Sequence, residues 1–401
     1  MFPPRARILT MNRGSATLKC ALYEAEDPSK LLVSMTIDRA GVSGGRLKIT
    51  DPNGTSLFDS PAGGGDSDAA LEEMFAWLDE HKYLSGLAAA GHRLVHGGPR
   101  YSEPQQITPK VLSELEQLVP LDPDHMPEAI RGIQFIARKF PALPQVACFD
   151  TAFHSSLPKV ARMYALPGRF YEKGILRYGF HGLSYEYIMG ELRALDAKLA
   201  AGRVIIAHLG SGASMVAVKD GKSVDTSMGF TPLEGLVMST RSGDVDPGLL
   251  LYLLAQENMP AKELSRLLNK ESGLLGISGT TADMRDLLAK ASHDPRAGDA
   301  VELFCYRARK YIGAYAAALE GLDALVFTGG IGEHAPRIRE RICSGLEFLG
   351  IRVDSSRNEA NAPLISTSDS RVNVRVIQTD EDRMIVRHVI AVLGRTTSNP
   401  D

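Results

Sequence analysis

The stretches GSATLKCAL (14–22) and GSGASMVAV (210–218) align without a gap. Each follows a short apolar run, 8–11 or 204–209, and places glycine and serine in a tight turn before a second apolar strand. The offset is 196 residues (210 minus 14), about half of the 401-residue chain. Hairpins of this kind are common, so the pattern is equally compatible with two unrelated hairpins. We interpret it as a weak internal duplication, which predicts two α/β domains.

Strand-like and helix-like segments alternate on both sides of this repeat. Apolar runs predict further strands at 29–38, 44–51, 87–95 and 145–149. Helical spacing predicts helices at 68–81, 109–119, 127–139, 247–257, 260–270 and 298–320. Residues 52–68 are rich in Gly, Pro, Asp and Ser and predict a surface loop. Because no low-complexity linker divides the halves, we expect a large interface with a cleft between the domains.

Composition excludes several classes of protein. The chain has 45 Lys and Arg against 48 Asp and Glu, a formal charge of −3, which argues against nucleic-acid binding. Neither a run of about 20 apolar residues nor a signal peptide is found, so we expect no membrane segment. The four cysteines stand singly, without CxxC or metal-ligand spacing, which favours a reducing, cytoplasmic location.

Three glycine-bearing loops follow apolar strands, at 12–15, 208–212 and 329–333. Such loops leave backbone N–H groups able to face phosphate oxygens. A single glycine-rich turn is weak support, because most are structural. Three of them after strands favour nucleotide phosphate binding, without the signature of a P-loop or a Rossmann dinucleotide site.

Charged residues stand next to glycines at the ends of apolar segments. Arg93 lies in GHRLVHGG (91–98), Asp150 in FDTAFH (149–154), His181 in RYGFHGLS (177–184) and Arg241 in TRSGD (240–244). For a lone Arg or Asp at a strand end, a structural salt bridge is the simpler reading. Two arginines together with a histidine and an aspartate instead favour a clamp for a carboxylate or a transferring phosphoryl group.

These motifs, together with HLGSGAS (208–214), SMGFTPLEGLVMSTRSGDVDPG (227–248) and TGGIGEHAPRIR (328–339), resemble the acetate kinase family and its propionate and butyrate kinase relatives. The resemblance runs from Asn12 to Arg387. It implies the duplicated actin, sugar-kinase and Hsp70 fold, with ATP in the interdomain cleft and a homodimer. It also implies an N-terminal domain of 1–150, completed by a C-terminal helix at about 382–395, and a C-terminal domain of 151–381 with the nucleotide pocket.

The resemblance also implies a role for each matching residue. Asn12 and Glu381 correspond to a Mg²⁺ (or Mn²⁺) site, and Arg93 to the carboxylate-binding residue. Asp150, His181 and Arg241 correspond to catalytic residues. The small alkyl pocket corresponds to Val95, Leu121, Phe180 and Pro232. The residues for ATP or ADP are Lys19, His208, Leu209, Gly210, Ser211, Gly212, Asp283, Met284, Arg285, Gly329, Gly330, Ile331, Gly332 and Glu333.

The chemistry that this family performs is consistent with those residue types. A carboxylic acid is already ionised at pH 7, so the nucleophile needs no strong base. The difficulty is to bring two anions together, which cationic groups offset. Asp150 is then an orienting or metal-linked group in preference to a proton acceptor.

The sequence departs from the family's pattern at several positions. Ala16 lacks a hydroxyl of the opening turn, and Arg13 adds charge beside it. Asp122 stands where the family has a histidine, and Ser211 where it has an asparagine. Whether His125 takes the place of that histidine is left open by the sequence. Leu183 and Tyr185 stand where the family has Thr and His. These changes leave open a propionate or butyrate kinase, and a nucleotide-binding paralogue with little activity. Apart from these motifs, the charged run RIRER (337–341) is expected on a solvated helix face.

Overall fold

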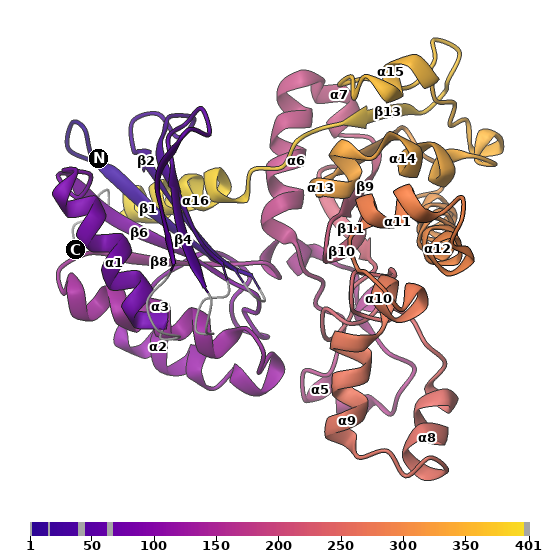
Figure 1. The fold of residues 1–401 in the computed structure, drawn as a ribbon, viewed down its shortest axis with the longest axis horizontal. Coiled ribbons are helices and arrows are strands. Elements are labelled where there is room, and N and C mark those ends of the chain that lie inside the picture. The colour runs from indigo at the N-terminus through magenta and orange to yellow at the C-terminus, as the bar shows by residue number, and fades with distance from the viewer. Residues whose placement is uncertain (1, 15–16, 39–44, 62–66, 397–401) are drawn as a thin grey trace. The chain divides into compact units, whose positions relative to one another are not determined.

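A computed structural model describes residues 2–14, 17–38, 45–61 and 67–396 of the chain. The chain divides into two compact units (Figure 1). Unit 1 comprises Met1–Ala152 and Asp380–Asp401, and unit 2 comprises Phe153–Thr379. Each unit is built on one sheet with helices packed against it, so each has its own core.

The described part of unit 1 forms an eight-stranded sheet in the order β5-β4-β3-β2-β1-β6-β8-β7. Neighbours from β1 to β5 pair antiparallel, whereas β1, β6 and β8 are parallel and β7 is antiparallel to β8. The strands are β1 (Arg7–Arg13), β2 (Thr17–Glu24), β3 (Leu31–Asp38), β4 (Arg46–Thr50), β5 (Ser56–Pro61), β6 (Leu87–Leu94), β7 (Gln105–Gln106) and β8 (Gln145–Phe149).

Helices cover both faces of the sheet of unit 1. The core on one face includes Leu9, Leu22, Phe75 and Ile136, which are contributed by strands β1 and β2 and by helices α1 and α3. The C-terminal helix α16 packs against β1 and β6, among the first strands of the chain (Figure 1). It approaches β6 closely at Gly91, where a Cβ would lie 2.3 Å from Ile385 Cγ2. The helical segments of unit 1 are α1 (Ser67–Glu80), α2 (Pro109–Glu116), η1 (Val119–Leu121), α3 (Met126–Lys139) and α16 (Glu381–Thr396), and η2 (Ala152–Ser156) bridges the division between the units.

The sheet of unit 2 has five strands in the order β11-β10-β9-β12-β13. Its pairings repeat those of β3-β2-β1-β6-β8, with an antiparallel hairpin in the first three strands and parallel pairing in the last three. The strands are β9 (Arg203–Leu209), β10 (Ala213–Lys219), β11 (Lys222–Thr226), β12 (Ala324–Thr328) and β13 (Asn373–Val376). Adding 196 to the bounds of β1 gives those of β9, so the two hairpins are equivalent elements of a duplicated unit.

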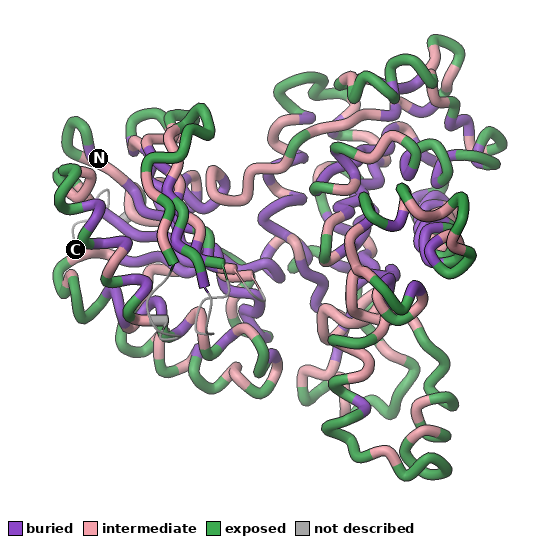
Figure 2. Tube along the Cα trace, viewed as in Figure 1, coloured by how far each residue is buried: buried purple, intermediate pink, exposed green. Residues whose placement is uncertain are grey.

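The central strands of both sheets, such as β8, β9, β10 and β12, are largely buried, whereas the edge strands β5 and β7 have no buried residue (Figure 2). The longest helix of unit 2, α12, begins after the N-cap Asp294, whose side chain accepts from two backbone N–H groups. The other helical segments of unit 2 are α4 (Lys159–Arg162), α5 (Gly168–Glu172), α6 (Gly182–Leu195), α7 (Ala197–Ala200), α8 (Pro247–Ala255), α9 (Ala261–Arg266), η3 (Leu267–Glu271), α10 (Gly273–Ser278), α11 (Met284–Lys290), α12 (Pro295–Ala318), α13 (Gly329–His334), α14 (Pro336–Cys343), η4 (Glu347–Leu349) and α15 (Ser355–Glu359).

Two expectations from the sequence are wrong in part. The segment 52–68 is not all loop, because Ser56–Pro61 forms strand β5, which pairs with β4 and places Phe58 against Trp77; residues 62–66 lie outside the described part. The helix expected at 260–270 is regular only over Ala261–Arg266, and a π-helical turn at Leu267–Glu271 follows it. No helix in the described part of the chain is long and apolar enough to cross a membrane.

Candidate active site

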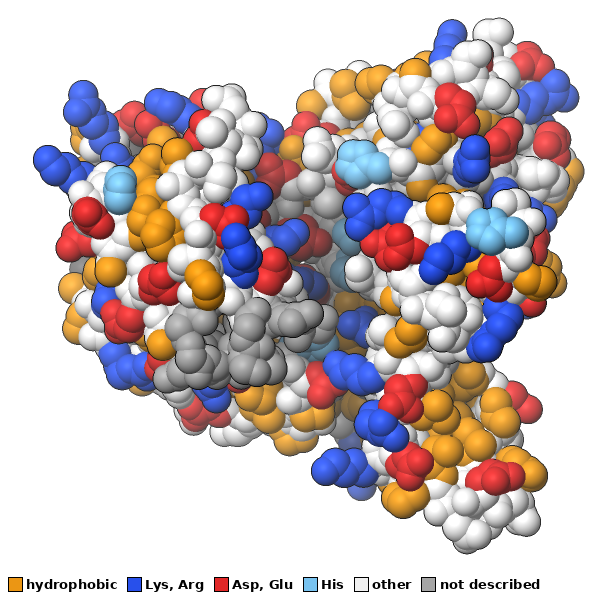
Figure 3. All heavy atoms as spheres, in the orientation of Figure 1, with side chains coloured by type: hydrophobic (Ala, Val, Ile, Leu, Met, Phe, Trp, Pro, Cys, Tyr) orange, Lys and Arg blue, Asp and Glu red, His pale blue; other side chains and the backbone are white. Residues whose placement is uncertain are grey.

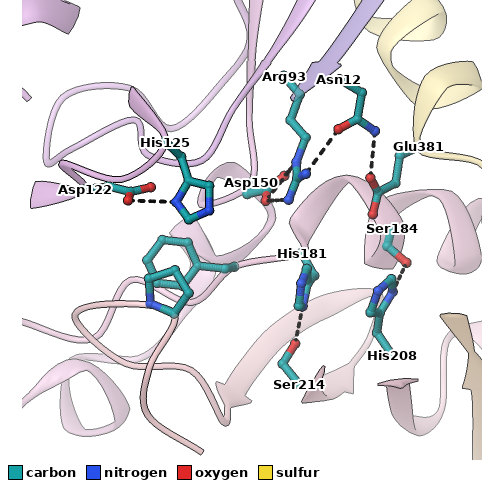
Figure 4. Close-up of polar contacts among 12 residues, drawn as sticks. Asn12, Arg93, Asp122, His125, Asp150, His181, Ser184, His208, Ser214 and Glu381 are labelled. Carbon is teal, nitrogen blue, oxygen red and sulfur yellow. Dashed lines mark hydrogen bonds and ion pairs between the residues drawn. The ribbon is translucent and has the colours of Figure 1, made fainter. Parts of the chain in front are cut away.

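Arg93, near the end of β6, donates hydrogen bonds to two residues of unit 1, Asp150 and Asn12, each at the end of another strand. Its Nε and Nη2 donate to Asp150, with Nη2 2.6 Å from Oδ2, and its Nη1 donates to Oδ1 of Asn12 at 3.1 Å (Figure 4). A guanidinium has five N–H donors, of which these contacts use three. One N–H on Nη1 and one on Nη2 remain, with no acceptor among the described residues. These two N–H groups can donate to an anion such as a carboxylate.

Carboxylates surround this guanidinium. Burial by itself lowers the pKa of Arg93, but the charges of Asp150, Glu381 and Asp382 outweigh it and raise that pKa. Asp150 is itself 1% exposed. A buried ion pair of this kind is strongly destabilised when one partner is removed, because the other charge is left without compensation. Arg93 is therefore a fixed cation in the site.

The first turn of α16 brings acidic side chains to the same strand, β1. Oε2 of Glu381 accepts from Nδ2 of Asn12 at 3.0 Å, and Oδ1 of Asp382 accepts from the Thr10 hydroxyl at 2.9 Å. Burial raises the pKa of Asp382 to about 7, while the nearby charge of Lys19 opposes the rise. Lys19 lies opposite Asn12 in the β1–β2 ladder and is exposed.

In unit 2, two histidine rings stack at a centroid distance of 4.4 Å with 22° between their planes. His181 stands at the N-cap of α6 with φ 58°, and His208 lies on β9. Nδ1 of His181 is 2.8 Å from Oγ of Ser214, and Nδ1 of His208 is 2.8 Å from Oγ of Ser184 (Figure 4). Both rings are therefore held through Nδ1, and Nε2 of each points elsewhere.

The Nε2 atoms of His181 and His208 lie near the glycines of the loop 210–212. A Cβ built at Gly212 would lie 3.3 Å from Nε2 of His181 and 3.7 Å from Nη1 of Arg241. A Cβ built at Gly210 would lie 3.9 Å from Nε2 of His208. Gly212 thus keeps open a space bordered by the imidazole of His181 and the guanidinium of Arg241, which suits an anion, whereas the Cβ position of Gly210 also lies 3.2 Å from the carbonyl oxygen of Gly212.

A pocket of about 880 Å³ opens beside this loop in unit 2. Seven of the residues predicted for the nucleotide line it: Gly210, Ser211, Asp283, Met284, Arg285, Gly330 and Ile331. The rest of the lining was not predicted to bind the nucleotide and consists of Ser239, Ala282, Leu288, Ala289, His334, Ala335, Pro336, Arg337 and Glu359. The volume is within the usual range for small-molecule and cofactor sites.

The remaining residues predicted for the nucleotide lie outside that lining. They are His208, Leu209, Gly212, Gly329, Gly332 and Glu333 of unit 2, and Lys19 of unit 1. Oε1 of Glu333 is buried and accepts from the backbone N–H groups of Gly329 and Thr379. Gly329 has φ 77°, and a Cβ there would lie 2.8 Å from the carbonyl oxygen of Leu209, so only glycine fits. Glu333 therefore orders the turn.

The prediction that the run 337–341 is a solvated face is wrong for Arg339. Its side chain is fully buried and donates to the carbonyls of Gly332 and Glu333 and to Asn358. Only Arg337, Glu340 and Arg341 of the run are exposed. A sequence pattern of alternating charge does not distinguish these cases, because the carbonyl acceptors come from α13 and α15.

Comparison with known proteins agrees with this arrangement. The model of the Acetokinase family matches residues 7–387. The chain is 46% identical to the acetate kinase of Methylocella silvestris over 402 residues, which cover 97% of this chain and 98% of that protein. The chain belongs to the acetokinase family.

Solved structures of acetokinases share the fold as well. The acetate kinase of Porphyromonas gingivalis superposes with a TM-score of 0.88 at 39% identity, covering 97% of this chain and all of that one (100%). The propionate kinase of Francisella tularensis gives 0.90 at 38% identity, covering 96% and 98%. The fold class predicted from the sequence, a duplicated actin-like ATPase fold, is thereby confirmed.

Two departures from the acetokinase pattern are accommodated locally. Arg13 points to the face of β1 opposite Asn12, because side chains alternate along a strand, and its Nη2 lies 3.4 Å from Oε2 of Glu128. Asp122 is buried, and its Oδ1 accepts from Nδ1 of His125 at 2.9 Å (Figure 4). Arg13 and Asp122 thus each interact with a side chain of this protein, Glu128 and His125 respectively. Ala16 lies outside the described residues.

The two histidines beside Arg93 in the acetokinase motif 91–98 form local hydrogen bonds. Nε2 of His92 is 2.7 Å from the side-chain oxygen of Gln145, and Nδ1 of His96 accepts from the N–H of Gly98. Burial lowers the pKa of both imidazoles to about 4, so both are neutral at pH 7. Neither adds charge to the site.

Of the four residues predicted for the alkyl pocket, two belong to each unit. Val95 and Leu121 belong to unit 1, and Phe180 and Pro232 to unit 2. Val95 and Phe180 are buried, and the other two are half-buried. The carbonyl of Pro232 accepts from Nη1 of Arg241 at 3.2 Å, which ties this residue to the cation beside Gly212.

Proposed function

We propose that this acetokinase transfers the γ-phosphoryl group of ATP to acetate, reversibly, giving acetyl phosphate and ADP. The observation that carries the proposal is Arg93, whose guanidinium is fixed by Asp150 and Asn12 and keeps one N–H on Nη1 and one on Nη2 that these contacts do not use. Acetate is ionised at pH 7, so it attacks without a general base. The contact with Arg93 makes Asp150 an orienting group in this proposal.

The step is a displacement at phosphorus. A carboxylate oxygen of acetate bonds to the γ-phosphorus while the bond from that phosphorus to the β,γ-bridging oxygen breaks, and the bridging oxygen leaves with ADP. Negative charge is spread over the three equatorial oxygens in the transition state. His181 and Arg241, which border one space at Gly212, are the groups proposed to receive this charge.

Mg²⁺ is proposed at Asn12 and Glu381. An amide and a carboxylate supply the oxygen donors that Mg²⁺ prefers. In this structure Nδ2 of Asn12 faces Glu381 at 3.0 Å and Oδ1 of Asn12 accepts from Arg93, so the proposal requires the Asn12 amide to turn its oxygen toward Glu381. No group of three or more His, Cys, Asp or Glu suited to a metal occurs in the described part of the chain, so phosphates and water would supply the other ligands. When bound, the ion would offset charge on the β- and γ-phosphates.

The adenosine of ATP is proposed for the 880 Å³ pocket of unit 2. Apolar side chains such as Met284, Leu288 and Ile331 line it, as a purine requires. Asp283 caps α11 and accepts from Nε and Nη2 of Arg285, so its carboxylate is already oriented. The pKa of Asp283 is lowered to about 2 by these hydrogen bonds, and it is therefore ionised.

A propionate or butyrate kinase is the alternative. Val95, Leu121, Phe180 and Pro232 favour a small pocket, but one methylene changes discrimination by only about 1–3 kcal/mol. One of the similar solved structures is that of a propionate kinase. Activity on both acetate and propionate is therefore compatible with these residues.

A homodimer is proposed through α8. This helix has the sequence PGLLLYLLA and no buried residue, and Leu251 and Tyr252 are 66% and 52% exposed. Apolar side chains gather over α8 in the lower part of unit 2 (Figure 3). Apolar patches of this kind mark contact surfaces. Leu251→Arg should give a monomer by light scattering if a second copy covers the helix.

A cytoplasmic location is proposed from the cysteines. Cys20, Cys148, Cys305 and Cys343 are all buried and free of disulfides. Burial raises the pKa of Cys305 and Cys343 to about 12, so these thiols are protonated and unreactive.

A hydroxylamine-trapping assay tests the function. Purified protein is incubated with ATP, MgCl₂ and acetate, propionate or butyrate, and acyl hydroxamate is measured. We expect product with acetate at the highest kcat/KM, and omission of Mg²⁺ should abolish it. Binding of ATP by calorimetry without product from any of the three acids would instead identify a nucleotide-binding paralogue.

A further inference from the structure

Arg241 lies in a short loop of unit 2, residues 238–242, which we call the arginine loop. One end of its side chain is held, because Nη1 donates to the carbonyl of Pro232 at 3.2 Å. The backbone of the loop lies against the connection between α9 and α10, where the chain forms the π-helical turn Leu267–Glu271. Turns of this kind are rare and occur frequently at functional sites.

Two carbonyl groups of the π-helical turn accept hydrogen bonds from the arginine loop. The carbonyl of Leu268 accepts from the backbone N–H of Ser242 at 3.1 Å, and that of Asn269 accepts from the hydroxyl of Thr240 at 2.9 Å. Thr240 and Ser242 are the two neighbours of Arg241 in the sequence. The turn therefore holds the backbone of Arg241 from both sides.

Ser272, the residue that follows the turn, makes the reciprocal contacts. Its backbone N–H donates to the carbonyl of Thr240 at 3.0 Å, and its hydroxyl donates to the carbonyl of Leu267 at 2.8 Å. In an uninterrupted α-helix that N–H would donate to the carbonyl of Leu268, four residues earlier, which here accepts from Ser242. The break in the helix thus exchanges a helical hydrogen bond for bonds to the arginine loop.

The first turn of α10 adds further contacts. The N–H of Leu274 donates to the carbonyl of Met238, and the N–H of Leu275 donates to the carbonyl of Ser239, each at 2.9 Å. The first N–H groups of a helix have no partner within it, so these carbonyls satisfy them. A Cβ at Gly273, which has φ 61°, would lie 2.2 Å from the carbonyl oxygen of Met238, so only glycine permits this approach.

The arginine loop is also joined to the loop 210–212. The N–H of Ser239 donates to the carbonyl of Ser211 at 3.1 Å. Nη1 of Arg241 lies 3.7 Å from the position of a Cβ at Gly212. The placement of the arginine loop therefore determines where the guanidinium lies relative to the space at Gly212.

We propose that Thr240 and Ser272 are positioning residues which, through the π-helical turn, fix Arg241 for the charge that develops on the transferred phosphoryl group. This inference rests on the proposed role of Arg241 in stabilising the transition state. Thr240 acts through its hydrogen bond to Asn269, and Ser272 acts through its bonds to Thr240 and Leu267. Because a cation fixed in advance needs no reorganisation as charge develops, loss of either hydroxyl should lower kcat more than substrate affinity.

Two variants of Thr240 differ by one hydroxyl. Thr240→Val keeps a branched side chain but removes the donor to the carbonyl of Asn269, whereas Thr240→Ser keeps the donor. Hydroxamate formation by the full-length protein with ATP, Mg²⁺ and acetate measures kcat and both KM values. We expect Thr240→Val to lower kcat about tenfold, the weight of one hydrogen bond, and to change KM for acetate and ATP less than threefold. Thr240→Ser should retain kcat within about twofold of the wild type.

Ser272→Ala is the second variant, and Ser370→Ala is its matched control. Both serines are half-buried and donate to backbone carbonyls, that of Leu267 for Ser272 and those of Gly350 and Val372 for Ser370. Ser272→Ala should lower kcat about fivefold, and Ser370→Ala should leave it unchanged. Urea unfolding should show similar losses of stability for the two variants, so kcat separates positioning from folding.

A double-variant cycle tests whether Thr240 acts through Arg241. Arg241→Lys keeps a cation but not the planar guanidinium that the arginine loop orients. In that background Thr240→Val should lower kcat less than about twofold further, because two residues that act as one unit are not additive. A second loss of about tenfold would overturn the inference.

Three other results would overturn it as well. These are kcat near the wild-type value for both Thr240→Val and Ser272→Ala, equal losses for Thr240→Val and Thr240→Ser, and a raised KM for ATP with unchanged kcat. Failure of the proposed function is distinguishable. Absence of acyl phosphate from the wild type would reject that function and this inference together, and full activity of Arg241→Ala would reject the role of Arg241.

Discussion

The carboxylate of Asp150 accepts from both Nε and Nη2 of Arg93, with the shorter contact 2.6 Å long between Nη2 and Oδ2. The two residues end neighbouring parallel strands, β6 and β8, where Cys148 pairs with Arg93 in the ladder. Parallel strands end at the same edge of a sheet. Arg93 and Asp150 therefore form an ion pair although they are 57 residues apart in the sequence. This pair determines which N–H groups of Arg93 remain for the proposed contact with the carboxylate.

Arg93→Ala should raise KM for the carboxylate about 100-fold and KM for ATP less than threefold, because it removes the proposed charge-assisted contact to one substrate only. Initial rates against each substrate in turn measure both constants. Equal effects on the two constants would contradict the assigned role. The free energy of unfolding is measured alongside, since Asp150 is left buried without its partner.

Asp150→Asn keeps the size of the side chain but removes its charge. Arg93 then loses the group that fixes its orientation, so KM for acetate should rise about tenfold while the KM for ATP stays within twofold. If kcat falls with an altered pH profile and KM does not change, Asp150 takes part in proton transfer instead. The same rate measurements at several pH values distinguish the outcomes.

Gly212→Ala should lower kcat about tenfold or more, because its Cβ would lie 3.3 Å from Nε2 of His181 and displace either that ring or Arg241. Stability should change little, since Gly212 is not among the positive-φ glycines. Gly313→Ala on α12 is the matched control: nothing lies within 4 Å of its Cβ, so activity should be unchanged. A fully active Gly212→Ala variant would mean that the space at Gly212 is not used.

His125→Ala removes the side chain that donates to Asp122, whose Oδ2 already has no hydrogen-bond partner among the described residues. Leaving a 5%-exposed carboxylate without a donor should lower the free energy of unfolding by about 1–3 kcal/mol, measured in urea. The double variant Asp122→Asn with His125→Ala should recover part of that loss. Additive losses in the double variant would show that the two side chains do not stabilise one another.

Asp382 makes stability depend on pH. Burial raises its pKa from the model-compound value of 3.8 to about 7, so the folded state favours the protonated acid. The stability contributed by this proton is complete below pH 3.8 and is lost as the pH rises through 7. The amide of Asp382→Asn has no such proton to lose. The free energy of unfolding of the variant should therefore rise relative to that of the wild type between pH 5 and about pH 8.

Urea unfolding of both proteins at these two pH values measures this difference. The buried histidines, such as His92 and His154, titrate in both proteins and cancel in the comparison. An identical pH dependence in the two proteins would mean that Asp382 is ionised throughout.

The elements that depend on local sequence pattern could be predicted without the structure. The repeated hairpin, the strand ends at Arg93 and Asp150 and the glycine loop 208–212 could be predicted, because apolar periodicity and turn residues are local properties. The loop assignment at 56–61 failed because strand β5 has a polar sequence, SLFDSP, and forms only by pairing with β4.

Which side chains contact one another depends on how distant elements pack. Arg339 reads as a surface charge, yet it is buried by carbonyls from α13 and by Asn358. Tyr185 and Ser214 are 29 residues apart, and Ser184 and Thr379 are 195 apart, so no spacing rule joins them. A side chain's partner depends on how its strand or helix packs against distant elements, which local periodicity does not encode.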